Sequence, residues 1–257
     1  MNLIYSLCAA FSMFSALPAP QVPWEKEKIR YMLAALPLVG AVIGGVQVLW
    51  LYVGRKLLFS SPFMDVGLTL IPVLLTGGIH LDGFMDTVDA LKSHAAPEKK
   101  RAILKDPHVG AFAAIGLFAY LLAYYSLCSG LVLFGRRYLL LFLIPVMSRS
   151  LSAVSGTLLP VRPGEGTLNI FHQAADRTVG VMAIGWVVLS AAGMVAVWPL
   201  VGGIMVSGAV ITLLLVRRMA MKEFEGVSGD IAGFQLQVAE LVMLALLVLT
   251  ERILVML

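Results

Sequence analysis

Long apolar runs alternate with short polar segments along almost the whole chain. Runs close to the roughly 20 residues that a membrane-spanning helix needs occupy residues 31–53, 109–134, 138–159, 179–198, 200–216 and 238–257. Shorter apolar runs cover residues 3–17 and 64–76. The pattern predicts an all-α, polytopic membrane helix bundle with about seven or eight membrane segments. Within the first long run, Gly40-x₃-Gly44 predicts the close approach of another helix.

Residues 77–91 break this pattern, because acidic side chains interrupt the apolar ones at regular intervals. At about 100° per residue, Asp82, Asp86 and Asp89 fall on one face of an amphipathic helix. Carboxylates spaced in this way repel one another by a few tenths of a kcal/mol in water, and more strongly near lipid. Mg²⁺ would relieve the repulsion, since it takes carboxylate oxygens together with water and substrate phosphates. A solvated acidic face, or helix caps after Gly77-Gly78, would explain the spacing as well.

The composition places the whole chain in the membrane. Of its 257 residues, 60% are hydrophobic and 13% are charged, and the mean hydropathy of +0.92 is far above that of soluble proteins. We therefore expect one membrane-embedded catalytic domain over residues 1–257. Cys8 and Cys128 lie in apolar runs, where a free cysteine behaves as a small hydrophobe. Neither a disulfide nor a cysteine-based metal site is expected.

The basic residues divide unevenly between the two sides of the predicted membrane. Alternating spans place thirteen Lys and Arg on one side and five on the other, with Arg149 left inside a span. Because Lys and Arg favour cytoplasmic loops, the first side is predicted to be cytoplasmic. Membrane orientation thus explains the net charge of +4 without nucleic acid. The four histidines and the acidic clusters fall on or beside the same side, which indicates an active site at the membrane surface.

Common nucleotide-binding and hydrolase motifs are absent from the sequence, including G-x₄-G-K-[ST], the nucleophile elbow and H-E-x-x-H. A carboxylate cluster surrounded by Lys and Arg suits phosphoryl-type transfer, in which cations neutralise phosphate charge. Arg149 fits this chemistry, because a charge inside a span is expensive and by default functional. A structural ion pair is the alternative for Arg149, and Glu240 has the same two possibilities.

The acidic motif resembles one known enzyme family. The run His80-Leu81-Asp82-Gly83-x₂-Asp86-x₂-Asp89-Ala90, preceded by Gly77-Gly78, closely resembles cobalamin synthase, the adenosylcobinamide-GDP ribazoletransferase family. Weaker matches follow in the family's order, at residues 14–20, Lys105-Asp106 with Gly110, Ser148-Arg149, Glu165-Gly166, and Gly226-x₂-Gly229-Asp230 with Glu240. The resemblance covers nearly the full length. The chain departs from the family pattern at Ala16, Pro107-His108, Ala113 and His172-Gln173.

The resemblance implies a Mg²⁺-dependent, multi-pass enzyme of a prokaryotic inner membrane, with its active site facing the cytoplasm. Its substrates would be adenosylcobinamide-GDP and α-ribazole or α-ribazole 5′-phosphate. The ribazole 5′-hydroxyl would attack the phosphorus attached to cobinamide, and GMP would leave. The product would be adenosylcobalamin or its phosphate, at the last stage of nucleotide-loop assembly in vitamin B12 biosynthesis.

The resemblance also implies roles for individual residues. The metal ligands would be Asp82, Asp86 and Asp89, and the catalytic set would be His80, Asp82, Asp86, Lys105 and Arg149. His80 would deprotonate the attacking hydroxyl or orient a substrate through a hydrogen bond. Cofactor or substrate contacts would come from Asp106, Glu165, Asp230 and Glu240. Local alternatives are a turn at Asp106, an N-cap at Asp230 and a pair with arginine at Glu240.

Two other functions stay open from the sequence. A CDP-alcohol phosphotransferase does related chemistry, but its D-G-x₂-A-R signature fails where Asp86-Thr87 stand. A polytopic transporter would use ionisable groups near mid-membrane, commonly in paired repeats, and the chain has no internal repeat. Transport predicts flux across vesicles without a chemical product, whereas the enzyme predicts Mg²⁺-dependent release of GMP.

Overall fold

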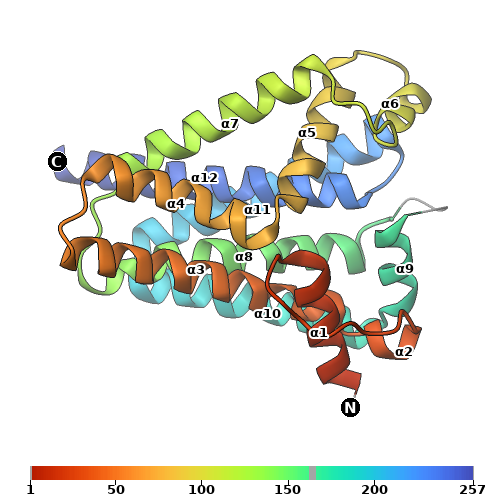
Figure 1. Cartoon of the computed structure of the whole chain (residues 1–257), viewed down its shortest axis with the longest axis horizontal. Helices are drawn as coiled ribbons and strands as arrows, with labels where there is room; N and C mark the ends of the chain where they lie inside the picture. Colours follow the sequence, from red (N-terminus) through yellow and green to blue (C-terminus); the bar gives the residue numbers. More distant parts are fainter. Residues whose placement is uncertain (1, 162–165, 257) are drawn as a thin grey trace.

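The computed structural model describes residues 2–161 and 166–256, and the regular elements in these ranges are helices (Figure 1). Their bounds are α1 (Asn2–Phe14), α2 (Lys26–Ile29), α3 (Met32–Lys56), α4 (Ser61–Thr76), α5 (Ile79–Lys92), α6 (Pro97–Ile103), α7 (Ala111–Ser129), the 3₁₀ helix η1 (Gly135–Arg137), α8 (Tyr138–Leu158), α9 (Thr167–Ala174), α10 (Arg177–Val197), α11 (Pro199–Phe224) and α12 (Gly229–Met256). The prediction of an all-α bundle is confirmed.

The described residues contain five or six candidate membrane spans, where about seven or eight membrane segments were predicted. Within residues 2–161 and 166–256, five helical stretches are long and apolar enough to cross a membrane, namely α3, α7, η1 with α8, α10 and α11. A sixth is counted if α4 and α5, which are bent by 94° at their junction, form one broken span. Over the predicted apolar run at residues 3–17, α1 has only 13 residues, about 20 Å of helix. It is too short to cross, so the chain is a polytopic membrane bundle of five or six candidate spans.

The long helices run back and forth between two ends of the bundle (Figure 1). At one end, α3 turns into α4, α7 leads through η1 into α8, and the chain terminates after α12. At the opposite end lie the short helices α1, α2, α6 and α9 with α5 and the connecting loops, which we call the polar end. Successive connections between the long helices therefore lie at opposite ends of the bundle.

The end opposite the polar end carries the smaller set of basic residues. Arg55 donates to the Leu133 carbonyl oxygen and Arg252 to the Gly130 carbonyl oxygen, both at 3.3 Å. Arg137 pairs with Glu251 at 3.3 Å. These contacts tie α3 and α12 to the loops around η1. The separation of basic residues that alternating spans predicted is present in the fold.

Helix α8 lies at the centre of the bundle, packed against α3, α10 and α12. Gly40 and Gly44 of α3 face it directly, because a carbon added to Gly44 would lie 2.8 Å from the Phe142 Cα atom. A carbon added to Gly40 would overlap the Pro145 carbonyl group. The close helix approach predicted from Gly40-x₃-Gly44 is confirmed, with α8 as the partner.

At the polar end, two helix boundaries and one additional helix differ from the sequence prediction. Helix α11 continues beyond residue 216 to Phe224, and α12 begins at Gly229, well before residue 238. The apolar pattern ends where each helix leaves the apolar layer, but backbone hydrogen bonding continues through the charged turns. The predicted polar loop at residues 160–178 contains the short helix α9, whose Leu168 and Phe171 are buried.

Candidate active site

Two glycines turn the chain sharply where the acidic helix begins. Gly77 and Gly78 have φ angles of +62° and +80°, a left-handed conformation that glycine adopts without steric cost. The Gly78 N–H donates to the Val73 carbonyl oxygen at 3.0 Å and closes the last turn of α4. Because α5 then leaves at 94° to α4, it lies across the polar end instead of along the bundle (Figure 1).

The three aspartates of α5 have different surroundings. Asp82 is exposed, whereas Asp86 and Asp89 are half-buried. Asp89 accepts a hydrogen bond from the Ala113 N–H at 3.3 Å, in the first turn of α7. The N-cap residue of α7 is Gly110, and a carbon added there would overlap the Asp89 carboxylate. Asp89 therefore caps α7 in place of a local side chain, and its role as a metal ligand stays a prediction.

Helices α5 and α12 cross at the site in direct backbone contact. A carbon added to Gly83 would lie 2.7 Å from the Asp230 Cα atom, and one added to Gly233 would lie 3.0 Å from the His80 carbonyl oxygen. Gly83 of α5 thus lies against Asp230 of α12, and Gly233 of α12 lies against His80 of α5. The crossing fixes Asp230 beside the face of α5 that carries Asp82.

Replacing Gly83 by valine should force α5 and α12 apart. The new side chain would meet the α12 backbone, which cannot rotate away as a flexible side chain can. Overpacking of this kind costs about 1–3 kcal/mol, so we expect a lower unfolding temperature in detergent. Gly45→Val is the matched control, because a carbon at Gly45 has no neighbour within 4 Å. A Gly83→Val protein as stable as this control would contradict the close crossing.

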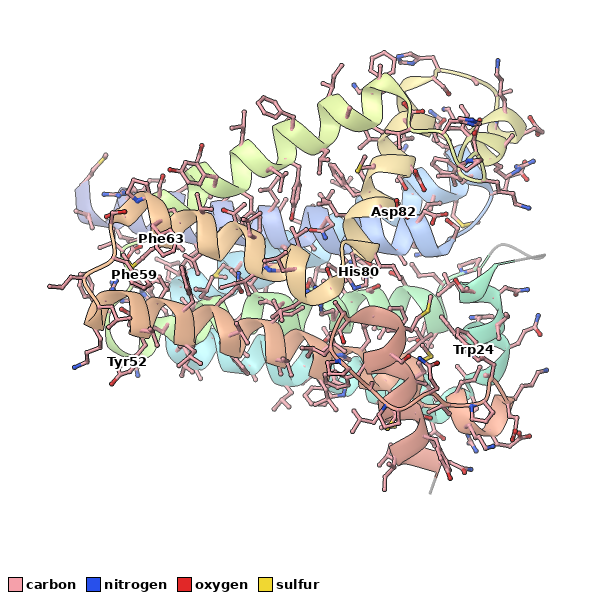
Figure 2. The ribbon with its side chains drawn as sticks, viewed as in Figure 1. Trp24, Tyr52, Phe59, Phe63, His80 and Asp82 are labelled. Carbon is pink, nitrogen blue, oxygen red and sulfur yellow. The ribbon has the colours of Figure 1, made fainter. Side chains whose placement is uncertain are left out.

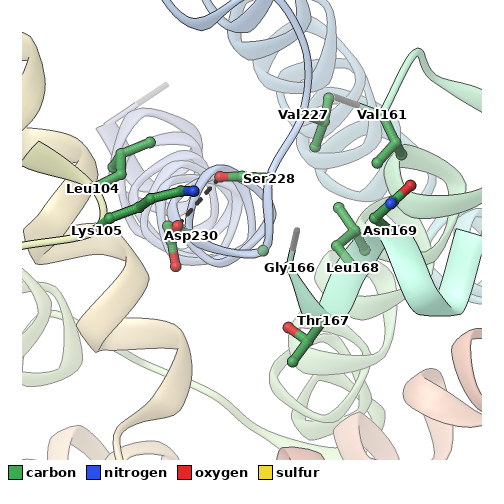
Figure 3. Close-up of a pocket in the computed structure, with 11 residues that line it drawn as sticks. Leu104, Lys105, Val161, Gly166, Thr167, Leu168, Asn169, Val227, Ser228 and Asp230 are labelled. Carbon is green, nitrogen blue, oxygen red and sulfur yellow. Dashed lines mark hydrogen bonds between the residues drawn. The ribbon is translucent and has the colours of Figure 1, made fainter. Parts of the chain in front are cut away.

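Three loops meet around a cavity of about 180 Å³ beside the crossing. The α6–α7 loop contributes Lys105, and α9 contributes Thr167 and Asn169. The α11–α12 loop contributes Ser228, and the first turn of α12 contributes Asp230. The Ser228 hydroxyl donates to the Asp230 carboxylate at 3.3 Å, and the Lys105 side chain extends toward both residues (Figure 3). The structure therefore brings the three polar loops together, as the sequence predicted.

Val161 and Val227 hold two of these loops in register. They form an isolated parallel bridge, in which the Val227 N–H donates to the Pro160 carbonyl oxygen at 3.0 Å. The bridge joins the start of the α8–α10 connection to the α11–α12 loop. Val161 and Val227 both line the cavity (Figure 3).

A second cavity of about 190 Å³ adjoins the first and has a more apolar lining. The two cavities share the lining residues Thr167, Leu168, Gly229 and Asp230. His80 and Asp82 line the second cavity, and both lie near the start of α5 (Figure 2). Of the predicted site residues, His80, Asp82, Lys105 and Asp230 therefore border one pair of adjoining cavities.

Arg149 and Glu240 lie away from these cavities, inside the helix bundle. Their side chains are 1% and 0% exposed and form an ion pair. Ser148 donates to the same Glu240 oxygen at 2.8 Å, and Arg149 also donates to the Ser148 hydroxyl at 3.1 Å. Of the two possibilities given from the sequence for Arg149 and Glu240, the structure thus contains the ion pair. A contact between Arg149 and substrate phosphate, which would require this pair to open, stays a prediction.

Asp106 forms a local turn at the exposed start of the α6–α7 loop. Its carboxylate accepts a hydrogen bond from the His108 N–H at 3.0 Å, and the His108 ring Nδ1 lies 2.7 Å away. These hydrogen bonds to His108 hold the pKa of Asp106 below its usual value. The neighbouring Lys105 faces the polar cavity, but Asp106 is not part of its lining. Glu165, the other predicted contact in a loop, lies outside the described residues.

The carboxylates at the polar end fit Mg²⁺ in type but do not form a preassembled cage. Among residues 2–161 and 166–256, no group of three His, Cys, Asp or Glu side chains is arranged to hold a metal ion. Mg²⁺ is usually bound by only one or two carboxylates together with substrate phosphates and water. Asp82 and Asp230, which line the same cavity, match this donor set.

Several lining residues were not anticipated from the sequence. Thr167 and Asn169 belong to α9, which was predicted as loop, and Ser228 precedes α12. The signal that was available for α9 is the apolar pair Leu168 and Phe171, spaced three residues apart as on one helix face. No signal in the sequence indicated that α1 and α9 form a wall of the second cavity.

Comparison with known proteins gives a full-length relationship. The family model described as CobS, cobalamin-5-phosphate synthase, matches residues 6–248. An adenosylcobinamide-GDP ribazoletransferase of Lachnoclostridium phytofermentans is 35% identical over 256 residues, which cover 99% of this chain and 97% of that protein. The protein of the same name from Desulfitobacterium hafniense is 33% identical, covering 95% of this chain and 96% of the relative. No solved structure matches the chain.

Proposed function

This chain belongs to the cobalamin-5-phosphate synthase family, and from that premise we propose that the polar end is the active site of an adenosylcobinamide-GDP ribazoletransferase. Such an enzyme assembles the nucleotide loop of cobalamin. The single observation that carries the proposal is the position of the family's acidic motif. Within a match over residues 6–248, that motif supplies His80 and Asp82 to a cavity that Asp230 also lines.

The substrates are adenosylcobinamide-GDP and α-ribazole or α-ribazole 5′-phosphate. The attacking oxygen belongs to a ribose hydroxyl other than the 5′-hydroxyl that the resemblance implied, because α-ribazole 5′-phosphate has its 5′-oxygen already esterified. That oxygen forms a bond to the phosphorus attached to cobinamide. The bond from that phosphorus to the GMP oxygen breaks, and GMP leaves with the electron pair. The hydroxyl proton passes to water beside the exposed Asp82. The other product is adenosylcobalamin or its phosphate.

Charged side chains of this chain would bind the diphosphate and neutralise its charge. The Lys105 ammonium lines the polar cavity and is placed to bind phosphate oxygens, whose negative charge it partly neutralises. Asp82 and Asp230, with Asp86 one helical turn beyond Asp82, would hold Mg²⁺. A bound Mg²⁺ would neutralise charge that develops on the diphosphate.

The polar end faces the cytoplasm of a prokaryotic cell in this proposal. The thirteen Lys and Arg of the sequence that fall on this side outnumber the five on the other, and an excess of basic residues marks cytoplasmic loops. A nucleotide-linked substrate is also supplied from the cytoplasm.

A purified preparation in liposomes should convert adenosylcobinamide-GDP and α-ribazole into a corrinoid of higher mass, with one GMP released per product. Release should stop when EDTA removes divalent cations and should return when Mg²⁺ is added in excess, because the acidic residues of α5 and α12 need a cation to accept the diphosphate. Mass analysis of the corrinoid and chromatography of GMP provide the readouts. Flux across the vesicle membrane without any new product would instead indicate a transporter.

A further inference from the structure

The apolar cavity next to Asp82 has an aromatic wall built from elements far apart in the sequence. Phe14 of α1 stacks on His80 of α5, with ring centroids 5.9 Å apart and an interplanar angle of 18°. Phe14 also contacts Phe171 of α9 edge to face at 6.1 Å, and Trp24 stacks on the other side of Phe171 at 5.7 Å. The rings support one another, so the wall is rigid and suits a flat aromatic guest.

The remainder of the cavity surface is mainly aliphatic. Met13, Leu33, Leu36, Ile79 and Ala232 line it together with Phe14 and Phe171. Its polar lining includes Asp82, Thr167 and Asp230, of which Thr167 and Asp230 also line the neighbouring polar cavity. The cavity therefore has an apolar interior and a polar border toward the place proposed for phosphates.

His80 provides an independent sign that a ligand belongs in this cavity. Its side chain lines the cavity and is only 6% exposed. Its Nε2 atom has no hydrogen-bond partner among the described residues. A buried polar atom without a partner costs about 1–3 kcal/mol, so a guest that offers a complementary atom would remove this cost on binding.

We propose that this cavity binds the base of α-ribazole, and that His80 holds the base by a hydrogen bond from Nε2–H to its unsubstituted ring nitrogen. The inference rests on the function proposed above and names the subsite for one of its substrates. The base is a flat benzimidazole with methyl groups, and its free ring nitrogen is the single polar atom that needs a partner. The unpartnered His80 nitrogen, in a cavity whose interior is mainly aliphatic and aromatic, matches that requirement.

Guanine, the other base in the reaction, is a poor match for the same cavity. Its edge carries several donors and acceptors, each of which loses free energy if it is buried without a partner. The adjoining cavity, with Lys105, Thr167, Asn169 and Ser228, offers the polar groups that a nucleotide needs. With the benzimidazole beside Phe14 and Phe171, the attached ribose would extend toward Asp230 at the shared border, and its attacking hydroxyl toward the diphosphate.

The experiment measures binding of α-ribazole to the full-length protein in phospholipid nanodiscs by equilibrium dialysis, without adenosylcobinamide-GDP. A second ligand is the indole riboside in which carbon replaces the free ring nitrogen. We expect Phe171→Ala to weaken binding of α-ribazole about tenfold or more by removing one face of the wall. The matched control is Phe118→Ala, because Phe118 is an exposed ring on α7, and it should bind as the unaltered protein does.

The role of His80 is tested by comparing the two ligands. The unaltered protein should bind α-ribazole about tenfold more tightly than the indole riboside, since the indole leaves Nε2 without a partner. His80→Ala should bind both ligands equally. His80→Gln should restore much of the preference, because its amide nitrogen can donate from a position near that of Nε2. If Phe171→Ala does not fold, Phe171→Leu is measured in its place, because leucine also lacks the aromatic ring.

Two results would overturn this inference while leaving the proposed function intact. One is an active enzyme in which changes at Phe171 and His80 leave the affinity for α-ribazole unaltered. The other is a selective loss of affinity for adenosylcobinamide-GDP, which would place guanine in the cavity. If the unaltered protein neither binds α-ribazole nor releases GMP, the proposed function itself is wrong. Each outcome therefore points to one of the two proposals.

Discussion

Replacing Asp82 by asparagine should lower the rate of GMP release about a hundredfold or more, while the protein still inserts and folds. Asp82 is exposed and lines the cavity beside Asp230, so the substitution removes negative charge that would hold Mg²⁺ without creating a void. Charge stabilisation by a metal ion supplies several kcal/mol in reactions at phosphorus. Initial rates of GMP release at saturating substrates, over a range of Mg²⁺ concentrations, would measure the loss.

Asp89→Asn is the matched control on the same helix face. The asparagine side-chain oxygen can still accept the hydrogen bond from the Ala113 N–H that Asp89 accepts at 3.3 Å, so the cap of α7 is retained. If Asp89 acts mainly as this cap, the variant should lose less than about tenfold in rate. Equal losses in both variants would favour the predicted three-aspartate metal site, and full activity of Asp82→Asn would contradict any metal role for Asp82.

Replacing Glu240 by glutamine should destabilise the protein by about 3–5 kcal/mol, the cost of leaving a buried charge without its partner. The Arg149 guanidinium is buried and pairs with Glu240 across two helices, 91 residues apart in sequence. Glutamine preserves the shape of the side chain, so the loss reflects charge and not a cavity. Unfolding in increasing denaturant, in detergent at fixed pH, would give the change in free energy.

Two further variants separate the ion pair from catalysis. Glu225→Gln, which breaks the exposed pair with Arg101, should cost less than about 1 kcal/mol. Removing both charges, with Arg149→Leu and Glu240→Leu, should recover most of the stability. A double variant that is stable but has lost affinity for adenosylcobinamide-GDP would support the phosphate contact predicted for Arg149. If Glu240→Gln is as stable as the unaltered protein, the buried pair is not a structural element.

The sequence predicted helices well wherever apolar periodicity alone determines them. The runs at residues 138–159 and 179–198 correspond closely to α8 (Tyr138–Leu158) and α10 (Arg177–Val197). The Gly40-x₃-Gly44 motif indicated a close helix contact, although only the fold identifies α8 as the partner. Prediction failed where a helix leaves the apolar layer, as in the last turns of α11, because polarity changes there while the backbone pattern does not.

The acidic motif located the site, but the role of each charged residue depends on parts of the chain that are distant in sequence. Spacing on α5 placed Asp82, Asp86 and Asp89 together, and it contained no information about Gly110, which leaves room for Asp89 at the start of α7. Likewise, Arg149 and Glu240 each looked like an isolated charge in an apolar run. Their pairing follows from the packing of α8 against α12, which local periodicity does not encode.

The sharp turn after α4 affects the surrounding lipid as well as the site. Helix α4 has 16 residues, about 24 Å of rise, whereas the hydrocarbon layer of an ordinary bilayer is about 30 Å thick. We expect lipid next to α4 to thin, because thinning is one way in which a bilayer accommodates a short apolar span. The acidic helix would then lie in a local depression of the membrane surface, where a large water-soluble molecule could approach it without entering the hydrocarbon layer.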